Sequence, residues 1–397
     1  MRVSTLSSYL TGLSAMQNLQ SALDQTQRQI STGRRILSPS DDPIAASRAL
    51  EFRESIARLA QFDRNAGIAE NRLAQEEAVV GSVNNVLQRV RELALQANNS
   101  TQSNETRGLI AVEMREQLDY LVQLANQKDG NGNYLFSGNL QDVEPVSRMG
   151  ASFAYNGDQG QRQIRIGDGR QIADGDPGSD IFFKIRAGNG DFTVAPVGGF
   201  AGTGVAGQGH VVDPTAWDQG NYTVRFVDPD NYEVIDSGGA TVASGAYQSG
   251  DRIAFAGIEF SMTGAPAAND EFSIQPSPYQ DIFTSIEQLA TSIEQSVTDD
   301  PSRARLNNSV NQGLQNIDQG IGNVLNIRTK IGSRLAVIEN QVDSNSGLAL
   351  TIQQTLASIE DLDYAEAISR LSQQLTTLEA AQQSFVRTQQ LSLFNFL

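Results

Sequence analysis

The chain has 397 residues, 39% of them hydrophobic, and a formal net charge of −17 at pH 7. This length allows two or three compact units, the acidic balance argues against general nucleic-acid binding, and no run approaches the twenty apolar residues that span a membrane. The absence of cysteine excludes disulfides, thiol catalysis and thiolate metal sites.

The stretch from Val3 to Ile30 predicts an amphipathic helix. Its apolar residues recur at heptad spacing at Tyr9, Met16, Leu23 and Ile30, with Leu6 and Leu13 in a neighbouring row that Gln20 and Gln27 interrupt. The N-terminus also lacks the basic start, continuous apolar centre and cleavage site of a secretory signal. We therefore expect any export to use another route.

The stretch "ISTGRRILSPSDDPIAASRAL", residues 30–50, predicts a joint between two helices. A glycine at position 33 can end the first helix in a left-handed cap, and Pro39 prevents its continuation. Asp42 suits the N-cap and Pro43 the first position of a new helix. The residues of this predicted interdomain joint are Gly33, Arg34, Arg35, Pro39, Asp41, Asp42 and Pro43. The alternative is an ordinary exposed loop whose charged residues are merely solvated.

Helical patterns continue from residue 43 to about 97 and from 104 to about 127. They return at about 280–297 and 301–358, and Asp300-Pro301 repeats the start signal seen at Asp42-Pro43. These four stretches predict a bundle of long helices.

Between these helices, residues 150–280 contain most of the 35 glycines and short alternating runs such as "NYTVRFVD". Such runs, separated by Asn-Gly, Asp-Gly and Asp-Pro turns, predict strands. We expect a β-hairpin attached to the helical bundle and a separate small β-domain over 171–277. The segment "GGFAGTGVAGQG", residues 198–209, is interpreted as a flexible loop.

The C-terminal stretch from Tyr364 to Phe385 predicts a second amphipathic helix. Asp363 and Glu366 form a potential capping box at its start. One heptad row holds Tyr364, Leu371, Leu378 and Phe385, and the next holds Ile368 and Leu375 before Gln382 breaks it.

The pattern as a whole predicts a nested, multidomain α + β architecture. Its parts are a terminal coiled coil from 1–40 and 358–397, a helical bundle with a β-hairpin from 41–170 and 278–357, and an outer β-domain over 171–277. The terminal seams are narrow and broken by glutamine, so burying them offsets little of the entropy lost on ordering the helices. Our hypothesis is that both termini are largely disordered in the monomer and become helical when neighbouring subunits supply a second apolar surface. The alternative is the private core of a monomeric bundle.

The sequence contains little that indicates catalysis. The single histidine, His210, falls in the glycine-rich segment and is interpreted as a solvated loop residue. "RAGNGDF" lacks the spacing of a phosphate-binding loop, and "DPDNYEVID" and "GDGRQIADGDPGSD" do not fit the spacing of an EF-hand. We interpret all three as turns and assign no catalytic residue, cofactor or metal.

Three segments resemble the bacterial flagellin superfamily. "ISTGRRILSPSDDPIAASRAL" resembles its N-terminal signature, "LQRVRELALQANNSTQSNETR" its following helix, and "IEDLDYAEAISRLSQQLTTLEAAQQSF" its C-terminal helix. Within the superfamily, "SPSDDPIAASRAL", "NGNYLFSGN" and "GIEFSMTGAPAANDEFSIQPS" are more similar to hook-filament junction proteins than to filament subunits. Filament subunits usually carry small residues where this chain has Pro43-Ile44.

This resemblance implies a non-enzymatic, flagellin-like structural protein at the extracellular hook-filament junction. It implies type III export, self-association into a ring, contacts with hook-associated protein 1 and flagellin, and an export chaperone on the C-terminal helix, with no nucleic-acid or membrane partner. The expected assembly interface is Leu6, Tyr9, Leu13, Met16, Leu23, Ile30, Tyr364, Ile368, Leu371, Leu375, Leu378 and Phe385. The alternatives are a filament subunit and, from a different class, a secreted binding module or enzyme.

Overall fold

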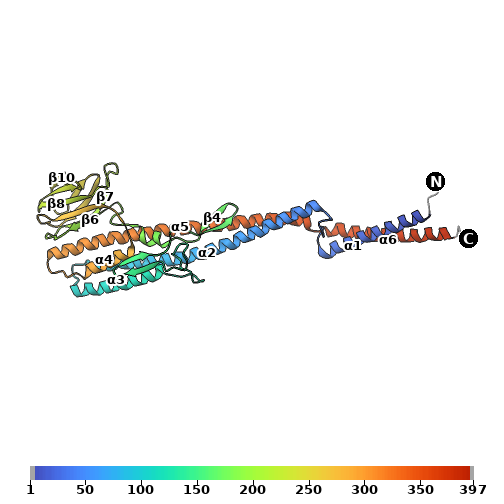
Figure 1. Ribbon diagram of the computed structural model, residues 1–397, viewed down its shortest axis with the longest axis horizontal. Coiled ribbons are helices and arrows are strands. Elements are labelled where there is room, and N and C mark those ends of the chain that lie inside the picture. Colours follow the sequence, from blue (N-terminus) through green and yellow to red (C-terminus); the bar gives the residue numbers. More distant parts are fainter. Residues whose placement is uncertain (1–4, 394–397) are drawn as a thin grey trace. The chain divides into compact units, whose positions relative to one another are not determined.

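The computed structural model describes residues 5–393, and it contains six α-helices close to the predicted stretches (Figure 1). They are α1 (Thr5–Thr32), α2 (Pro43–Ala97), α3 (Asn104–Ala125), α4 (Ile282–Glu294), α5 (Asp300–Glu360) and α6 (Tyr364–Leu393). In the part of the chain that the structure describes, none of these helices is long and apolar enough to cross a membrane.

The helix starts follow the capping logic of the sequence, with two corrections. The backbone N–H of Ala45 donates to the carboxylate of Asp42 at 3.0 Å, as expected for an N-cap. Before α5 the cap is Asp299 rather than Asp300, because the N–H of Ser302 donates to Asp299 at 2.9 Å. At α6 only half of the predicted capping box forms, since Glu366 accepts from Arg370 instead of closing back on its cap.

The described residues form two compact units. One, here called the terminal unit, comprises 1–64 with 340–397, and the other, the central unit, comprises 65–339. Both boundaries fall inside long helices, α2 and α5, whereas the sequence places domain boundaries near 40 and 358 and at the ends of the β-domain. The three-domain division stays a prediction.

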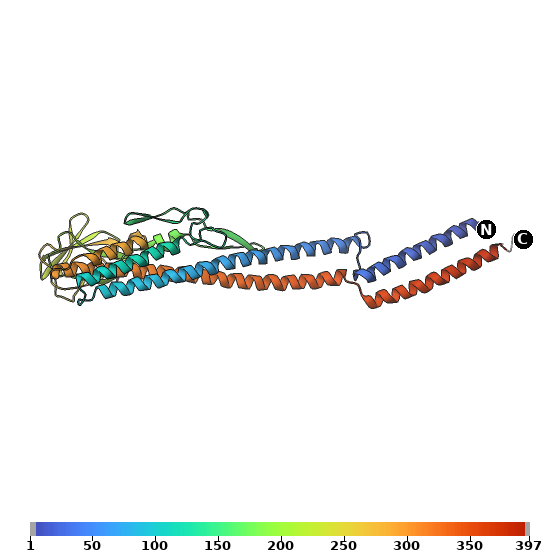
Figure 2. The ribbon, with the colours of Figure 1, turned by 90° about the horizontal axis from the view of Figure 1, so that it is seen from below.

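In the terminal unit, α1 and α6 run side by side (Figure 2). Tyr9 near the start of α1 stacks against Phe385 near the end of α6, and a Cβ on Gly33 would lie 2.9 Å from the hydroxyl of Tyr364. The two helices are therefore antiparallel, and the chain returns to its starting end as the nested pattern predicts.

The central unit has a closed helical core. Its fully buried apolar residues include Leu73, Val80, Val83 and Val90 from α2, Met114, Leu118 and Leu121 from α3, Phe283 and Ile286 from α4, and Val310, Ile317 and Ile331 from α5. Ion pairs tie the surfaces of these helices together, among them Arg91 with Asp318 at 2.7 Å. Each helix thus buries an apolar stripe against its neighbours.

Between α3 and α4 the chain forms short antiparallel strands and one π-helical turn. They are β1 (Val146–Met149), β2 (Ser152–Tyr155), β3 (Gln163–Gly167), β4 (Arg170–Ala173), η1 (Ser179–Phe183), β5 (Ile185–Arg186), β6 (Phe192–Val197), β7 (Val205–Val211), β8 (Tyr222–Asp228), β9 (Asn231–Asp236), β10 (Thr241–Ala246), β11 (Arg252–Phe255), β12 (Ile258–Thr263), β13 (Glu271–Pro276) and β14 (Tyr279–Gln280). The expected hairpin is in fact two, β1–β2 and β3–β4. The mixed helical and β fold class is confirmed.

Two small sheets surround an aromatic core in the β-rich segment. One has the strand order β10-β9-β8-β13-β6 and the other β11-β12-β7. Phe192, Phe226, Phe260 and Phe272 are almost fully buried between them. The inward positions of β8 and β12 alternate with outward ones, which is the period expected of half-buried strands.

The predicted loop at 198–209 is wrong, because β7 occupies its second half. Gly209 pairs with Phe260 across the sheet, and a Cβ there would lie 2.7 Å from the ring of Phe192. The glycines in this strand therefore allow close packing rather than flexibility. His210 consequently lies on a strand and not in a loop, with its side chain exposed and 3.2 Å from Glu259.

The turn predictions have mixed outcomes. "RAGNGDF" connects β5 to β6 and "DPDNYEVID" contains the β8–β9 turn, as predicted. "GDGRQIADGDPGSD" begins with the β3–β4 turn, but Asp174 and Asp176 after it are buried among arginines. Sequence spacing gives no sign of this burial, because the arginines come from distant parts of the chain.

The packing of β7 can be tested with two glycines of the same segment. We expect Gly209→Ala to lower the free energy of unfolding by about 1–3 kcal/mol, because the added methyl overlaps Phe192 and the backbone of Glu259. Gly199→Ala, where a Cβ meets nothing within 4 Å, should change it by less than about 0.5 kcal/mol. Urea denaturation followed by aromatic fluorescence measures both, and equal effects would contradict this packing.

Candidate assembly surface and interhelix joint

The contact between α1 and α6 is made by a narrow face of each helix. Leu23 in α1 and Ala367 in α6 are 8% and 0% exposed. At the other end of the pair, the ring centroids of Tyr9 and Phe385 lie 5.4 Å apart, and a Cβ on Gly12 would come within 3.1 Å of the Phe385 ring. Glycine at position 12 therefore leaves room for the Phe385 ring, and the heptad pattern of α1 did not predict this contact.

The two predicted rows of α6 differ in exposure. Leu371, Leu378 and Phe385 are half-buried, in the row that faces α1. Ile368 and Leu375 in the second row are 53% and 42% exposed. The intrachain pair therefore uses one row and leaves the other in contact with solvent.

The remaining predicted interface residues are partly exposed. Leu13, Met16 and Ile30 are half-buried, and Tyr364 is 50% exposed. Leu6 lies in α1, but its side chain is outside the described residues. Their role as an assembly interface stays a prediction.

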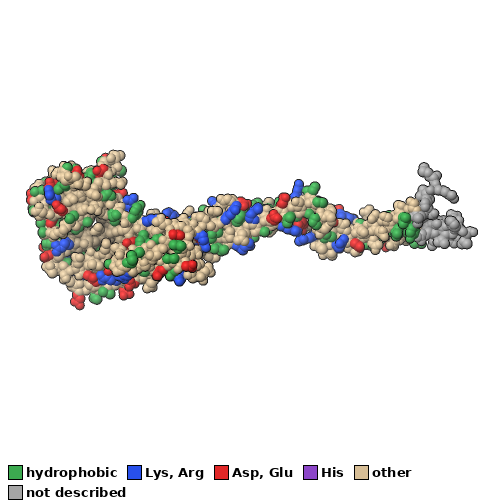
Figure 3. Space-filling view, viewed as in Figure 1, with side chains coloured by type: hydrophobic (Ala, Val, Ile, Leu, Met, Phe, Trp, Pro, Cys, Tyr) green, Lys and Arg blue, Asp and Glu red, His purple; other side chains and the backbone are tan. Residues whose placement is uncertain are grey.

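The terminal unit exposes further large apolar side chains that the sequence reading missed. Among the side chains that the structure describes, the set, each at least 42% exposed, is Tyr9, Leu10, Ile44, Leu50, Leu348, Leu350, Tyr364, Ile368, Leu375 and Val386. Figure 3 shows hydrophobic side chains lying among charged ones over the visible face of this unit. Heptad counting on α1 and α6 alone gives no signal for positions 44, 50, 348 and 350, because they lie on α2 and α5.

The joint between α1 and α2 is built on a left-handed glycine. Gly33 has a φ of 70°, and its N–H donates to Gln29 at 2.9 Å, which ends α1. Its carbonyl accepts from the N–H of Leu362 at 3.0 Å, while the N–H of Arg35 donates to the carbonyl of Glu360 at 2.7 Å. These bonds attach the joint to the end of α5.

Arg34 and Arg35 add side-chain and backbone contacts in the same place. Arg34 forms an isolated antiparallel bridge with Asp361. The guanidinium of Arg35 donates twice to the carbonyl of Ile359, at 3.1 and 2.8 Å, and also lies 3.7 Å from Asp42. The paired arginines therefore act locally, on the end of α5 and the start of α2.

Asp41 organises the loop that follows. Its carboxylate accepts from the N–H groups of Ser38 and Leu37 at 2.9 and 3.0 Å, and from the side chain of Gln25 at 3.1 Å. The backbone N–H bonds, that of Ser38 first, lower the pKa of Asp41 below its ordinary value. Pro39 is exposed between these anchors. The loop is thus an organised connection, held to α1 by Gln25.

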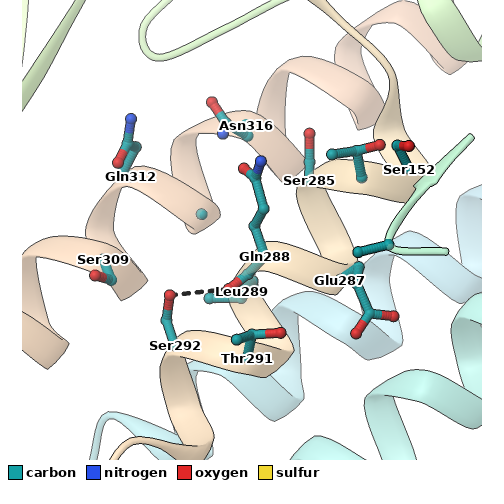
Figure 4. A pocket seen from close by; sticks show the side chains of 13 residues that line it. Ser152, Ser285, Glu287, Gln288, Leu289, Thr291, Ser292, Ser309, Gln312 and Asn316 are labelled. Carbon is teal, nitrogen blue, oxygen red and sulfur yellow. Dashed lines mark hydrogen bonds between the residues drawn. The ribbon is translucent and has the colours of Figure 1, made fainter.

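A polar hollow in the central unit is the other candidate site. It has a volume of about 630 Å³ and lies between α4 and α5 beside the β1–β2 hairpin (Figure 4). Its polar lining includes Ser152, Thr284, Ser285, Gln288, Thr291, Ser292, Ser309, Gln312 and Asn316. Glu287 is the carboxylate in this described lining, and Arg115 and Arg148 each hold it at 3.0 Å. The lining therefore offers hydroxyl and amide groups rather than a reactive pair.

Comparison with known proteins places the ends of the chain in one family. The model of the bacterial flagellin N-terminal helical region matches residues 3–141, and that of the C-terminal helical region matches 314–397. Flagellar hook-associated protein 3 of Escherichia coli (strain K12) is 25% identical over 394 residues, which cover 99% of each chain. Phase 1 flagellin of Salmonella naestved is 34% identical, but over 34% of this chain and 26% of its own.

Solved structures extend the likeness to the fold. The crystal structure of Xanthomonas campestris FlgL has 32% sequence identity and a TM-score of 0.72, covering 77% of this chain and 99% of its own. The hook-associated protein-3 of Legionella pneumophila has 29% identity and a TM-score of 0.75, covering 78% and 98%. The predicted resemblance and the flagellin-like fold are thereby confirmed.

The joint can be tested through its glycine. Gly33→Ala forces a side chain into a left-handed conformation and against the hydroxyl of Tyr364, so we expect a loss of about 1–2 kcal/mol in local stability. Hydrogen exchange at the Leu362 and Arg35 amides, which bond across the joint, should accelerate by about tenfold or more.

The matched control is Gly347→Ala within α5 of the same unit, where a Cβ meets nothing within 4 Å. That change should leave the two amides as protected as before or better protected, since alanine favours a helix by up to about 1 kcal/mol. The assigned role of the Gly33 cap would be wrong if both variants exchanged alike.

Proposed function

The chain belongs to the bacterial flagellin family of structural flagellar proteins, and from this we propose that it forms the junction between the hook and the filament. In this role it is a non-enzymatic structural protein of the extracellular flagellum. Copies of it associate into a ring that connects hook-associated protein 1 to flagellin. It requires no cofactor.

The observation that supports assembly most directly is the exposed second row of α6. Fully burying an exposed Ile or Leu side chain contributes about 1.5–3 kcal/mol, and the intrachain pair leaves about half of Ile368 and Leu375 in solvent. Several further exposed apolar residues lie on α1, α2 and α5 of the same unit. A surface of this kind suits contact with other helices, and copies or relatives of this chain carry matching ones.

The extent of the similarity favours a junction protein over a filament subunit. Hook-associated protein 3 matches 99% of the chain, including the β-rich middle, whereas the flagellin match covers 34%. A secreted binding module would have to act through a surface such as the polar hollow. Its carboxylate Glu287 is already held by two arginines.

Export and protection of the seam follow from the same proposal. The chain would leave the cell through the flagellar type III channel and reach the hook tip without cleavage. Before export, a chaperone would cover the C-terminal helix, because the row of Ile368 and Leu375 otherwise favours premature association.

Deletion of the gene and antibody labelling test the junction role together. Cells lacking the protein should keep the hook and release unattached flagellin into the medium. Labelled antibody should mark a single band at the hook-filament boundary of detached flagella. Labelling along the whole filament would instead indicate a filament subunit.

The assembly row yields a sharper prediction. We expect the double variant Ile368→Asp with Leu375→Asp to abolish filament attachment and swimming, because assembly would bury two unpaired carboxylates. Both side chains are exposed in the single chain, so circular dichroism of the purified variant should be unchanged. The amount secreted into the medium must also be measured, since loss of export would have the same effect on swimming.

The control is Gln373→Asp, which adds one negative charge, half that of the double variant, at an exposed position of α6 about half a helical turn from the seam position Leu371. It should swim normally. Normal swimming of the double variant at normal secretion would contradict the proposed interface.

A further inference from the structure

A buried cluster of charged side chains lies in the central unit where residues 174–178 leave β4. Arg72 and Glu76 of α2 are 8% and 2% exposed, and Asp174 and Asp176 are 1% and 3% exposed. Burying charges is costly unless each is paired. The arrangement of partners in this cluster therefore matters in detail.

Asp176 is the better satisfied of the two aspartates. Arg334 of α5 donates to both of its carboxylate oxygens at 2.8 Å, and Gln161 donates at 2.7 Å. The backbone N–H of Asp176 donates to Oε1 of Glu76 at 3.0 Å. Asp176 thereby joins α2 to α5 through one residue of the connecting segment.

Asp174 and Asp129 complete the pairing. Arg162 donates to Asp174, with its Nε at 2.8 Å. The Nη1 of Arg72 lies 3.1 Å from Asp129, while its Nε is 3.8 Å from Asp174, beyond hydrogen-bond distance. Most polar atoms of the cluster therefore have a hydrogen-bond partner within the protein.

Two polar atoms of the cluster have no hydrogen-bond partner among the described residues. They are Nε of Arg72 and Oε2 of Glu76. A Cβ built on Gly175 would lie 3.6 Å from each and 4.0 Å from the carbonyl oxygen of Leu135. All three polar atoms therefore face the same side of Gly175, next to a cavity of about 10 Å³ whose lining includes Arg72, Leu135, Asp174, Gly175 and Asp176.

The size and chemistry of this point fit one water molecule. A volume of about 10–15 Å³ measured in this way holds one water, and buried waters typically make about three hydrogen bonds. Here the site offers an N–H donor from Arg72, the carboxyl of Glu76 and a carbonyl acceptor from Leu135. The described residues contain no group of three or more acidic or histidine side chains able to hold a metal.

We propose that Arg72, Glu76 and the space beside Gly175 form a binding site for a single internal water molecule that locks residues 174–178 between α2 and α5. The water accepts from Nε of Arg72, hydrogen-bonds with Oε2 of Glu76 and donates to the carbonyl of Leu135. It completes the only two unpartnered side-chain atoms of the described cluster. Removing it leaves a buried guanidinium N–H and a buried carboxyl oxygen unsatisfied.

The charge balance of the cluster favours a protonated Glu76. Four carboxyl groups, Glu76, Asp129, Asp174 and Asp176, face three guanidinium groups, Arg72, Arg162 and Arg334. With Glu76 neutral, the cluster has no net charge. Burial, followed by the neighbouring charge of Asp176, raises the pKa of Glu76 well above its ordinary value, although Arg334 and Arg72 act in the opposite direction.

The residue at position 175 supplies a direct test. Its Cβ would make ordinary van der Waals contact with its neighbours, so Gly175→Ala fits but occupies the place of the water. In the full-length wild-type protein, a high-resolution crystal structure should contain one ordered water within about 3.2 Å of both unpartnered atoms. In Gly175→Ala that water should be absent, and amide exchange over 175–178 should accelerate by about tenfold.

Gly67→Ala on α2, where a Cβ meets nothing within 4 Å, is the control and should not accelerate this exchange. Absence of ordered water in the wild-type site, or unchanged exchange in Gly175→Ala, would overturn the proposal.

Protonation is tested with Glu76→Gln, which keeps an oxygen for the Asp176 N–H and an N–H₂ group toward the water. A raised folded-state pKa gives stability that is fully present below the unfolded pKa and is lost as pH rises through the folded one. Protection of the Asp176 amide, corrected for intrinsic exchange, should therefore decline with rising pH in the wild type. In Glu76→Gln it should stay constant and exceed the wild type at alkaline pH.

Glu70→Gln, at an exposed position of the same helix, should retain the wild-type pH profile. Parallel profiles in which the wild type is less protected than Glu76→Gln even at the lowest pH measured would show that Glu76 is ionised in the fold and would contradict a site that is neutral overall.

Discussion

The pairing of α1 with α6 through one narrow apolar face of each helix is the constraint on which the terminal unit depends. Leu23 and Ala367 are the apolar residues most nearly excluded from water among the described positions of these two helices, while Ile368 and Leu375 remain in solvent. One narrow contact offsets little of the entropy lost in ordering two long helices. A further partner would therefore stabilise the pair, and the exposed row of α6 is available to bind one.

The central unit, unlike the terminal one, has a large core of its own. Its helices bury an extended apolar core, although Leu109 and Val112 of α3 remain exposed, and its β-rich segment closes around phenylalanine rings. Where charge is buried, Asp176 receives a bidentate arginine and a second polar donor. Such pairing contributes less to net stability than to the definition of one geometry, because any displaced partner leaves a charge uncompensated. The completed unit and the incomplete one thus suit a protein that folds in part alone and in part on assembly.

The sequence predicted the helices well because their signals are local. Asp42-Pro43 and Gly33 fix helix ends through capping bonds within a few residues, and both behave as expected. Heptad spacing identified both rows of α6 but could not tell which faces α1, since that depends on the partner's surface. The glycines of β7 were misread for the same reason: the crowding by Phe192 that favours Gly209 comes from another strand. Asp174 and Asp176 look like turn residues until arginines distant in the chain are placed beside them.

Along α1, the polar contacts fix the register of the helix, whereas the apolar contacts supply the binding energy. Near the joint, the buried positions are polar: Thr26 is 2% exposed and Gln29 is 7% exposed, with the Gln29 side chain donating to the carbonyl of Arg35 at 2.7 Å. A buried hydrogen bond fails if the helix slides by one residue, so this end fixes how α1 meets the joint. Farther from the joint, the contacts are sparse and apolar, and they tolerate repacking. A helix whose register is already fixed at one end can accept different neighbours along the other without losing its alignment, which is what the proposed position between two kinds of partner requires.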